Sequence, residues 1–219
     1  MKTADVKNYY DNFLNHLKYD HVRENPRHAK IKQDLSKIIK KGMNVLDIGC
    51  GIGITTKYIA ELGATVKGID ISEKLIEYAK ANSAHSNATY AVKDMTVLDN
   101  DKKTYDVISL VDVAEHIPRD KILYFVQNIN WRSHENTVIY LNIPDARLQT
   151  FLKQHYPNKL QIVDEAYYIH EIIGWFSHFG FEAISIDNYG VDFPLQYISF
   201  IFVKVGILNR SYGKYYGRG

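Results

Sequence analysis

Apolar side chains in the first part of the chain recur at the three- and four-residue intervals of amphipathic helices. Between Val6 and Leu17 they fall on one helical face. A second helix is expected to begin near Pro26, whose fixed φ suits a first turn, and to stop at Gly42, which tolerates the left-handed end of a helix. The inward positions of this second helix are Ile31, Leu35, Ile38 and Ile39.

From Asn44 onward, short apolar runs alternate with helical patterns. The expected strands are Asn44–Ile48, Thr65–Ile69, Ala88–Val92, Tyr105–Leu110 and Thr137–Ile143. The expected helices are Thr55–Leu62, a helix capped by Ser72 that ends at Ala81, and Lys121–Asn130. Because the early strands are apolar on both faces, this alternation predicts a mostly parallel sheet covered by helices on both sides.

The alternation breaks after Pro144. An irregular, aromatic stretch is expected as far as Glu165, followed by a helix over His170–His178. Two strands then follow, Phe181–Asn188 and Gln196–Val205. Their short connection has no room for a crossover helix, so the two strands are predicted to pair antiparallel.

Composition narrows the class of protein. The 219 residues, 46% hydrophobic and 24% charged, suffice for one globular domain. A net charge of +2 lacks the broad field of a dedicated duplex-binding protein, so a nucleic-acid partner is not favoured. Cys50 is the one cysteine, which excludes an intramolecular disulfide and makes a reducing cytoplasm the expected location. No apolar run approaches the ~20 residues of a membrane span, so no membrane partner is expected.

Three alternate glycines separate the first expected strand from its helix, in the run Val-Leu-Asp47-Ile-Gly49-Cys-Gly51-Ile-Gly53. In such a turn the backbone can approach a ligand where a Cβ would collide. Seventeen residues after Gly53, Asp70 ends the second strand, where a carboxylate would meet a ribose diol bound across the turn. The G-x-G-x-G spacing differs from the G-x-G-x-x-G fingerprint and points away from NAD.

Four motifs in order make the chain resemble class I S-adenosylmethionine-dependent methyltransferases over about residues 43–205. They are the glycine run above, then Gly68-Ile-Asp-Ile-Ser72, Lys93-Asp-Met95 and Tyr105-Asp-Val-Ile-Ser-Leu110. The resemblance implies an α/β, Rossmann-like, seven-stranded and mostly parallel sheet with an antiparallel last strand and helices on both faces. It also implies S-adenosyl-L-methionine as the cofactor.

The same resemblance assigns the parts of that cofactor. Asp47 with the turn of Gly49, Gly51 and Gly53 would hold the methionine part. Asp70 would hold the ribose, and Ile71 and Met95 would enclose the adenine rings. Asp94 would accept a hydrogen bond from the adenine amino group, and Val111 would lie beside the cofactor.

The resemblance further implies one methyltransferase domain over residues 1–210. Residues 1–41 would form an N-terminal helical cap, and residues 43–205 the core, with residues 144–165 inserted as a lid. Residues 211–219 combine glycine, tyrosine, lysine and arginine and are expected to be a flexible tail.

A cluster of ionisable residues follows the fourth strand, where open α/β sheets place their ligands. The run Asp112-Val-Ala-Glu115-His116 is similar to the Glu-x-x-Glu-His stretch of ubiquinone-biosynthesis O-methyltransferases, with Asp112 in place of the first glutamate. Asp112, Glu115 and His116 are therefore the catalytic candidates.

Three interpretations of this cluster stay open. In the first, His116 takes the proton from a substrate hydroxyl. In the second, Asp112, Glu115 and His116, with His170, bind a divalent cation that lowers the pKa of the hydroxyl. In the third, Glu115 and His116 cap the following turn. No metal is assigned, because a mixed carboxylate and histidine set does not select one.

Tyrosine is frequent, with 17 residues, and offers a flat apolar face with a polar tip. The resemblance would place the N-terminal helix and the 144–165 insertion over the cofactor. The resulting substrate-contact candidates are Tyr9, Tyr10, His155, Tyr156, Tyr168 and His170.

The favoured function is methylation of a small molecule, on oxygen rather than nitrogen, with a hydroxylated metabolite or a sugar as acceptor. One alternative is methylation of tRNA or protein, against which stand the low net charge and the lack of an Asn/Asp-Pro-Pro-Tyr/Phe signature. Another is a non-catalytic regulatory protein that binds the cofactor. A monomer and a homodimer are both compatible with the sequence.

Overall fold

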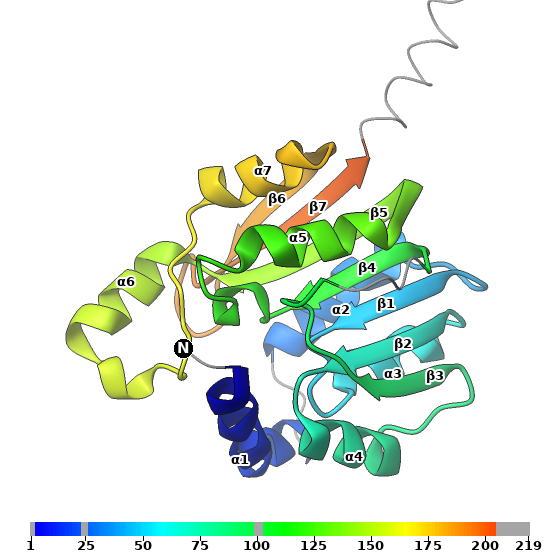
Figure 1. The fold of residues 1–219 in the computed structure, drawn as a ribbon, viewed down its shortest axis with the longest axis horizontal. Coiled ribbons are helices and arrows are strands. Elements are labelled where there is room, and N and C mark those ends of the chain that lie inside the picture. Colours follow the sequence, from blue (N-terminus) through cyan, green and yellow to red (C-terminus); the bar gives the residue numbers. More distant parts are fainter. Residues whose placement is uncertain (1–2, 23–25, 99–102, 205–219) are drawn as a thin grey trace, which may run out of the picture.

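A computed structural model describes residues 3–22, 26–98 and 103–204 (Figure 1). Its centre is a seven-stranded sheet in the order β3-β2-β1-β4-β5-β7-β6. The strands are β1 (Asn44–Ile48), β2 (Thr65–Asp70), β3 (Ala88–Val92), β4 (Tyr105–Val111), β5 (Ser133–Pro144), β6 (Phe181–Tyr189) and β7 (Tyr197–Lys204). Strands β1 to β5 pair in parallel, and β7 is antiparallel to both β5 and β6, which confirms the predicted fold class.

Helices cover both faces of this sheet, as predicted (Figure 1). They are α1 (Thr3–Val22), α2 (Pro26–Ile38), α3 (Ile54–Glu61), α4 (Glu73–Asn82), α5 (Ile122–Trp131), α6 (Ala146–His155) and α7 (Ile169–His178), with short 3-10 helices η1 (Ala114–His116) and η2 (Pro157–Lys159). Helices α2 and α3 pack on one face around buried Leu35 and Ile59, and α5 and α7 pack on the other around Phe125 and Phe176. This apolar burial is the main force holding the layers together.

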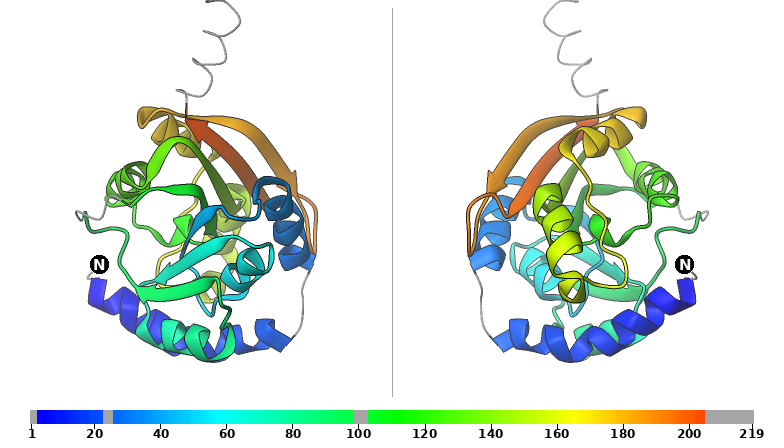
Figure 2. Two further views of the ribbon diagram at one scale, coloured as in Figure 1. Left: turned by 90° about the vertical axis from the view of Figure 1, so that its right-hand side faces the viewer. Right: turned by 90° about the vertical axis from the view of Figure 1, so that its left-hand side faces the viewer.

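Strand register positions the residues that carry the site. Asp47 of β1 stands opposite Gly68 of β2 and Ser109 of β4. The carboxyl ends of the parallel strands therefore meet at one edge of the sheet, beside η1, α1 and α6 (Figure 1). Helix α1 runs alongside α4 and covers that edge (Figure 2).

The stretch after Pro144 differs from the expectation of an irregular segment. It contains α6 and η2 before the chain becomes extended. Helix α6 forms because the side chain of Asp145 accepts a hydrogen bond from the backbone N–H of Arg147 and caps the first turn. Its inward face contains Ala146 and Gln149, too little apolar surface to show helical periodicity in the sequence.

Other boundaries differ less. Helix α1 and strand β5 are longer than expected, and α2 ends before Gly42. The expected tail at 211–219 and the last residue of the final expected strand lie outside the described residues. Among the described helices none combines the length and the apolar character needed to cross a membrane.

Candidate functional site

A cavity of about 520 Å³ lies at the carboxyl edge of the sheet. Its floor is the glycine turn after β1 and the ends of β2 and β4, its roof is α1, and its far wall is η1 with α6 and the segment 161–164. This volume is typical of small-molecule sites. The cavity has two ends, one at the glycine turn and one at η1.

The glycine turn forms the floor, and all three glycines have positive φ. A Cβ on Gly49 would lie 2.5 Å from Val113 Cγ2, and one on Gly53 would lie 2.8 Å from the Tyr90 hydroxyl oxygen, so packing requires glycine at both. At Gly51, which lines the cavity, the nearest atom to a Cβ would be Leu17 Cδ1 at 3.9 Å. Gly51 is therefore the glycine whose missing side chain leaves space in the cavity.

Asp70 ends β2 and closes the turn. Its Oδ2 accepts from the Gly51 N–H at 3.0 Å and its Oδ1 from the Ser72 N–H at 2.9 Å. Burial raises the pKa of the Asp70 carboxyl, against the effect of these hydrogen bonds. Because each oxygen can accept a second hydrogen bond, the carboxylate can still receive two hydroxyl groups from the cavity.

Asp47 lies beneath the turn and is only 1% exposed. Its carboxylate accepts from Thr56 Oγ1 at 2.6 Å and from Ser109 Oγ at 2.7 Å, which ties β1 to α3 and β4. Burial raises the pKa of Asp47 to about 6. Asp47 thus anchors the turn from below as well as lining the cavity.

The predicted adenine residues Ile71 and Met95 both line the cavity as apolar walls, and so does Val111 at the end of β4. Asp94 Oδ1 accepts from both the backbone N–H and the hydroxyl of Thr96. Its Oδ2 is buried and has no partner among the described residues. A buried acceptor between apolar walls fits the amino group and rings of adenine, so this end of the cavity fits the adenosyl group of S-adenosylmethionine.

The opposite end begins at Asp112, the first of the catalytic candidates. Its backbone has φ 51°, a conformation that turns the chain sharply after β4. Its carboxylate forms an ion pair with Arg27 and accepts from Asn142 Nδ2 at 2.8 Å. These bonds hold α2, η1 and β5 together at the cavity wall.

Glu115 and His116 lie next to each other in η1. Glu115 is 1% exposed, and its Oε2 has no partner among the described residues. Burial, and then the charge of Asp112, raise the pKa of Glu115 well above its ordinary value. Burial lowers the pKa of His116, so the imidazole is neutral near pH 7.

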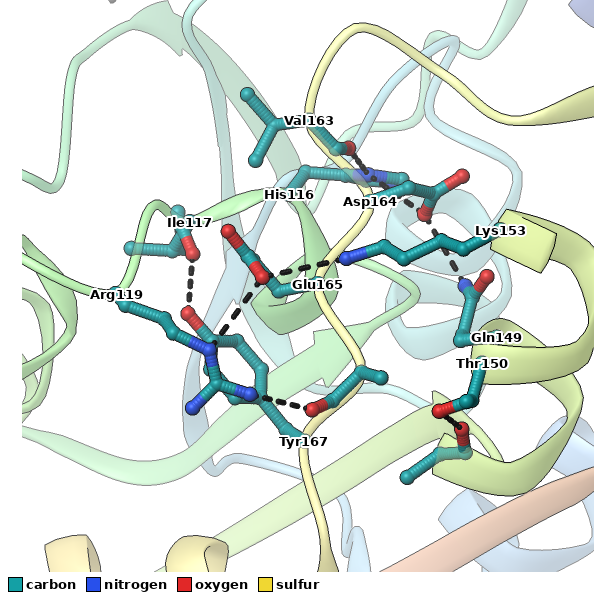
Figure 3. Close-up of polar contacts among 12 residues, drawn as sticks. His116, Ile117, Arg119, Gln149, Thr150, Lys153, Val163, Asp164, Glu165 and Tyr167 are labelled. Atoms are coloured by element: carbon teal, nitrogen blue, oxygen red, sulfur yellow. Dashed lines mark hydrogen bonds and ion pairs between the residues drawn. The ribbon is translucent and has the colours of Figure 1, made fainter. Parts of the chain in front are cut away.

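The ring of His116 is oriented by the segment that follows α6 (Figure 3). Nδ1 lies 2.7 Å from the Val163 carbonyl oxygen, which accepts only, so Nδ1 carries the proton of the neutral ring. The lone pair is then on Nε2, 3.8 Å from Glu115 Oε1. Asp164 Oδ1 lies 3.5 Å from Nδ1. The geometry leaves Nε2 able to accept a proton.

Several residues of this end were not foreseen from the sequence. They are Arg27, Gln149, Gln161, Val163, Asp164 and Tyr197. The polar ones come from α2, α6, β7 and the 161–164 segment, which only the tertiary fold brings together. No sequence motif marks them, because each reaches the cavity only through the tertiary placement of its element.

Of the predicted substrate contacts, the structure brings Tyr10 to the cavity and leaves the others outside it. Tyr10 lines the cavity, its ring centroid is 5.7 Å from that of His116, and its buried hydroxyl has no partner among the described residues. Tyr9 stacks on Phe13 and is not in the cavity wall. Tyr168 and His170 are exposed and stack on each other at the start of α7, which turns Ile172 and Phe176 inward instead. The structure does not bring these three, nor the exposed residues 155 and 156, into the cavity.

The structure does not bring the residues of the suggested metal site together either. Within the described part of the chain, no three His, Cys, Asp or Glu side chains converge as a metal site requires. Asp112 is instead paired with Arg27, and His170 lies outside the cavity wall.

Comparison with known proteins adds the family. The chain matches the family described as a methyltransferase domain over residues 19–186. A ubiquinone biosynthesis O-methyltransferase of Coxiella burnetii is 37% identical over 92 residues, 41% of this chain and 39% of that protein. One from Paraburkholderia xenovorans is 38% identical over 81 residues, 36% of this chain and 35% of that protein. The chain thus matches less than two fifths of the length of these curated relatives.

Solved structures share the fold. Magnesium protoporphyrin IX methyltransferase of Synechocystis PCC 6803, with bound SAH, superposes with a TM-score of 0.76 at 19% identity, covering 93% of this chain and 100% of that one. An S-adenosylmethionine-dependent methyltransferase of Mesorhizobium loti gives 0.68 at 14% identity, covering 80% and 96%. The chain therefore belongs to the methyltransferase domain family, with the class I fold of enzymes that use S-adenosylmethionine.

Proposed function

We propose that this protein transfers a methyl group from S-adenosylmethionine to a hydroxyl oxygen of a small molecule, a hydroxylated metabolite or a sugar. The observation that carries the proposal is the neutral His116 imidazole, with its Nε2 lone pair available, in the same cavity as the glycine turn. A hydroxyl nucleophile must lose its proton, and a neutral imidazole is suited to take it.

The residues at the floor would hold the cofactor. Asp70 would accept from the ribose hydroxyls, Asp94 Oδ2 from the adenine amino group, and Ile71 and Met95 would enclose the adenine rings. Asp47 would support the turn beneath the methionine part. When bound, the cofactor supplies a methyl group already activated by its sulfonium, so the protein mainly aligns the reacting groups and excludes water.

At the other end, His116 would receive the hydroxyl proton on Nε2 as the oxygen–methyl bond forms. The Val163 carbonyl holds the ring in the required tautomer throughout, and Asp164 at 3.5 Å favours the imidazolium that results. Asp112 would act through structure, by holding η1 against α2 and β5.

A small acceptor is supported by the enclosure of the cavity under α1 and against α6. Oxygen as the methylated atom is supported by the curated relatives, which are named O-methyltransferases. Methylation of tRNA or protein and a purely regulatory role remain the alternatives.

The proposal is tested by measuring S-adenosylhomocysteine release from S-adenosylmethionine with panels of hydroxylated small molecules, of tRNA and of protein. The expected result is release with a small hydroxylated acceptor only, reduced in His116→Gln. Tight cofactor binding without release from any panel would favour the regulatory alternative, and release with tRNA or protein would favour the macromolecular one.

A further inference from the structure

Four side-chain oxygens at the catalytic end of the cavity have no hydrogen-bond partner among the described residues. They are Tyr10 Oη, Glu115 Oε2, Gln149 Oε1 and Gln161 Oε1. All four residues line the cavity, and the atoms themselves are buried. Since buried polar groups in folded proteins almost always have a partner, this group of oxygens points to a ligand that supplies one.

The unpartnered side-chain atom of Gln149 can only accept a hydrogen bond. Gln149 Nε2 donates to Asp164 Oδ1 at 3.1 Å (Figure 3). A carboxylate accepts hydrogen bonds and does not donate, so the amide of Gln149 cannot be reversed and its Oε1 is the unpartnered atom. At only 4% exposure, Gln149 is held by the packing of α6 as well.

Asp164 arranges this end of the cavity. Its Oδ2 accepts from the backbone N–H of Gln161 at 2.9 Å, while its Oδ1 holds Gln149 and lies 3.5 Å from His116 Nδ1. One carboxylate therefore holds the side chain of Gln149 and the backbone of Gln161 beside the proposed base. A hydroxyl that reaches His116 would bring the rest of its molecule against the two amide oxygens.

The charged groups at this end of the cavity also determine which acceptors are disfavoured. The cavity wall here contains the Asp164 carboxylate and Glu115, whose raised pKa favours the neutral acid, and the Arg27 guanidinium is paired with Asp112. An anionic acceptor would meet the Asp164 carboxylate and the amide oxygen of Gln149, and a largely apolar phenol would leave that amide oxygen unpaired.

We propose that Gln149 and Gln161 are specificity-determining residues that select an acceptor with several hydroxyl or amino hydrogen-bond donors, a polyol or amino polyol, over an apolar phenol. This inference rests on the proposed function, because it assigns the acceptor of that same site. Sites that hydrogen-bond a substrate discriminate strongly against analogues that lack the donor, since the site's own buried groups are then left unpaired.

The test compares the wild-type protein with Gln149→Leu and Gln161→Leu, and with Gln154→Leu as a matched control on the exposed side of α6. Each protein is saturated with S-adenosylhomocysteine, and the binding of two probe sets is measured by ligand-observed NMR. One set contains monosaccharides, inositol and glucosamine, and the other contains alkyl-substituted catechols. Methyl transfer to the same probes is measured separately.

The expected result is tighter binding of at least one polyol or amino polyol than of any catechol by the wild type and by Gln154→Leu. Each of the other two leucine variants should weaken that binding by about tenfold and leave S-adenosylhomocysteine affinity unchanged. Preference for catechols, binding of neither set, or an unchanged preference in both leucine variants overturns the inference. Polyol binding that depends on the two glutamines but is never followed by methyl transfer overturns the proposed function and retains only the ligand selectivity of the two glutamines.

Discussion

Burial shifts Asp47 and His116, two individual side chains of the site, towards their neutral forms. The pKa of Asp47 rises to about 6 because its carboxyl is removed from water, and the pKa of His116 falls for the same reason. The hydrogen bonds that each group makes oppose the shift without cancelling it. At the residue scale, protonation in this site is therefore governed by desolvation, and two predictions depend on it.

His116→Gln is expected to lower kcat by about 10²- to 10⁴-fold, because the variant lacks the proposed proton acceptor. In the wild type, kcat/KM should rise with pH through a pKa below the ordinary 6.5 and be level above it. Since the folded-state pKa is depressed, the associated stability is present above pH 6.5 and lost as pH falls through the folded-state value. Steady-state kinetics and thermal melts across pH check both; a variant with wild-type kcat, or a kinetic limb above pH 6.5, would contradict the role.

Asp47→Asn is expected to be more stable than the wild type at high pH. The raised pKa means that the carboxyl favours folding below its unfolded value of 3.8, and that this contribution is lost as pH rises through about 6. The amide can still bond the hydroxyls of Thr56 and Ser109. With about 1.4 kcal/mol for each pKa unit, the advantage in the free energy of unfolding should grow by up to about 3 kcal/mol between about pH 4 and pH 8. Denaturant titrations at the two pH values would refute this by giving a pH-independent difference.

At the scale of elements, the glycine turn and the segment after α6 differ in how visible they are in the sequence. The turn was predicted because alternate glycines between a strand and a helix indicate backbone conformations that other residues rarely adopt. The positive φ values of these glycines confirm it. Helix α6 was missed because its inward face carries the amide of Gln149. Tyr168 was misplaced because an aromatic residue that begins a helix carries no signal of which side it faces. The ends of β1 agreed closely because its apolar run ends where burial ends, whereas β5 begins earlier than expected.

Two glycines of the turn are expected to affect different properties when changed to alanine, one the stability of the fold and the other the affinity for the cofactor. Gly49→Ala forces a Cβ to 2.5 Å from Val113 and should lower stability and displace η1. Gly51→Ala meets nothing closer than 3.9 Å, so the fold should survive with only the backbone cost of positive φ, about 1 kcal/mol, while S-adenosylhomocysteine affinity falls. Thermal melts with calorimetry separate the cases. Equal loss of melting temperature in both variants, with affinity retained by Gly51→Ala, would count against this division.

At the scale of the whole molecule, α1 covers the cavity and is held to α4 rather than to the sheet (Figure 2). Asp11 Oδ1 accepts from the Ser72 hydroxyl at 2.6 Å, and Lys7 pairs with Glu73 at 2.9 Å. Tyr10 and Leu17 of α1 line the cavity. The roof of the site is therefore held by its contacts with α4. We expect the strength of these contacts to affect how fast a ligand leaves the cavity.

Asp11→Ala is expected to weaken S-adenosylhomocysteine binding by roughly fivefold, mostly through faster dissociation. The variant loses the hydrogen bonds that Asp11 Oδ1 accepts from the Ser72 hydroxyl and, at 3.3 Å, from the Lys74 N–H, and a net loss of about 1 kcal/mol favours positions of α1 that leave the cavity open. Asp5→Ala, at an exposed position on the same helix, is the control. Stopped-flow displacement measures the rate. Equal dissociation rates in the two variants would mean that α1 does not retain the cofactor.

The cofactor site is tested most directly by calorimetric titration of the wild type, Asp70→Asn and Asp187→Asn with S-adenosylmethionine and S-adenosylhomocysteine. Asp70 lies on the cavity floor, while Asp187 is an exposed acid of β6 paired with Lys30. We expect binding by the wild type and by Asp187→Asn, and loss of binding in a folded Asp70→Asn. No binding by the wild type, or equal binding by all three proteins, would contradict it.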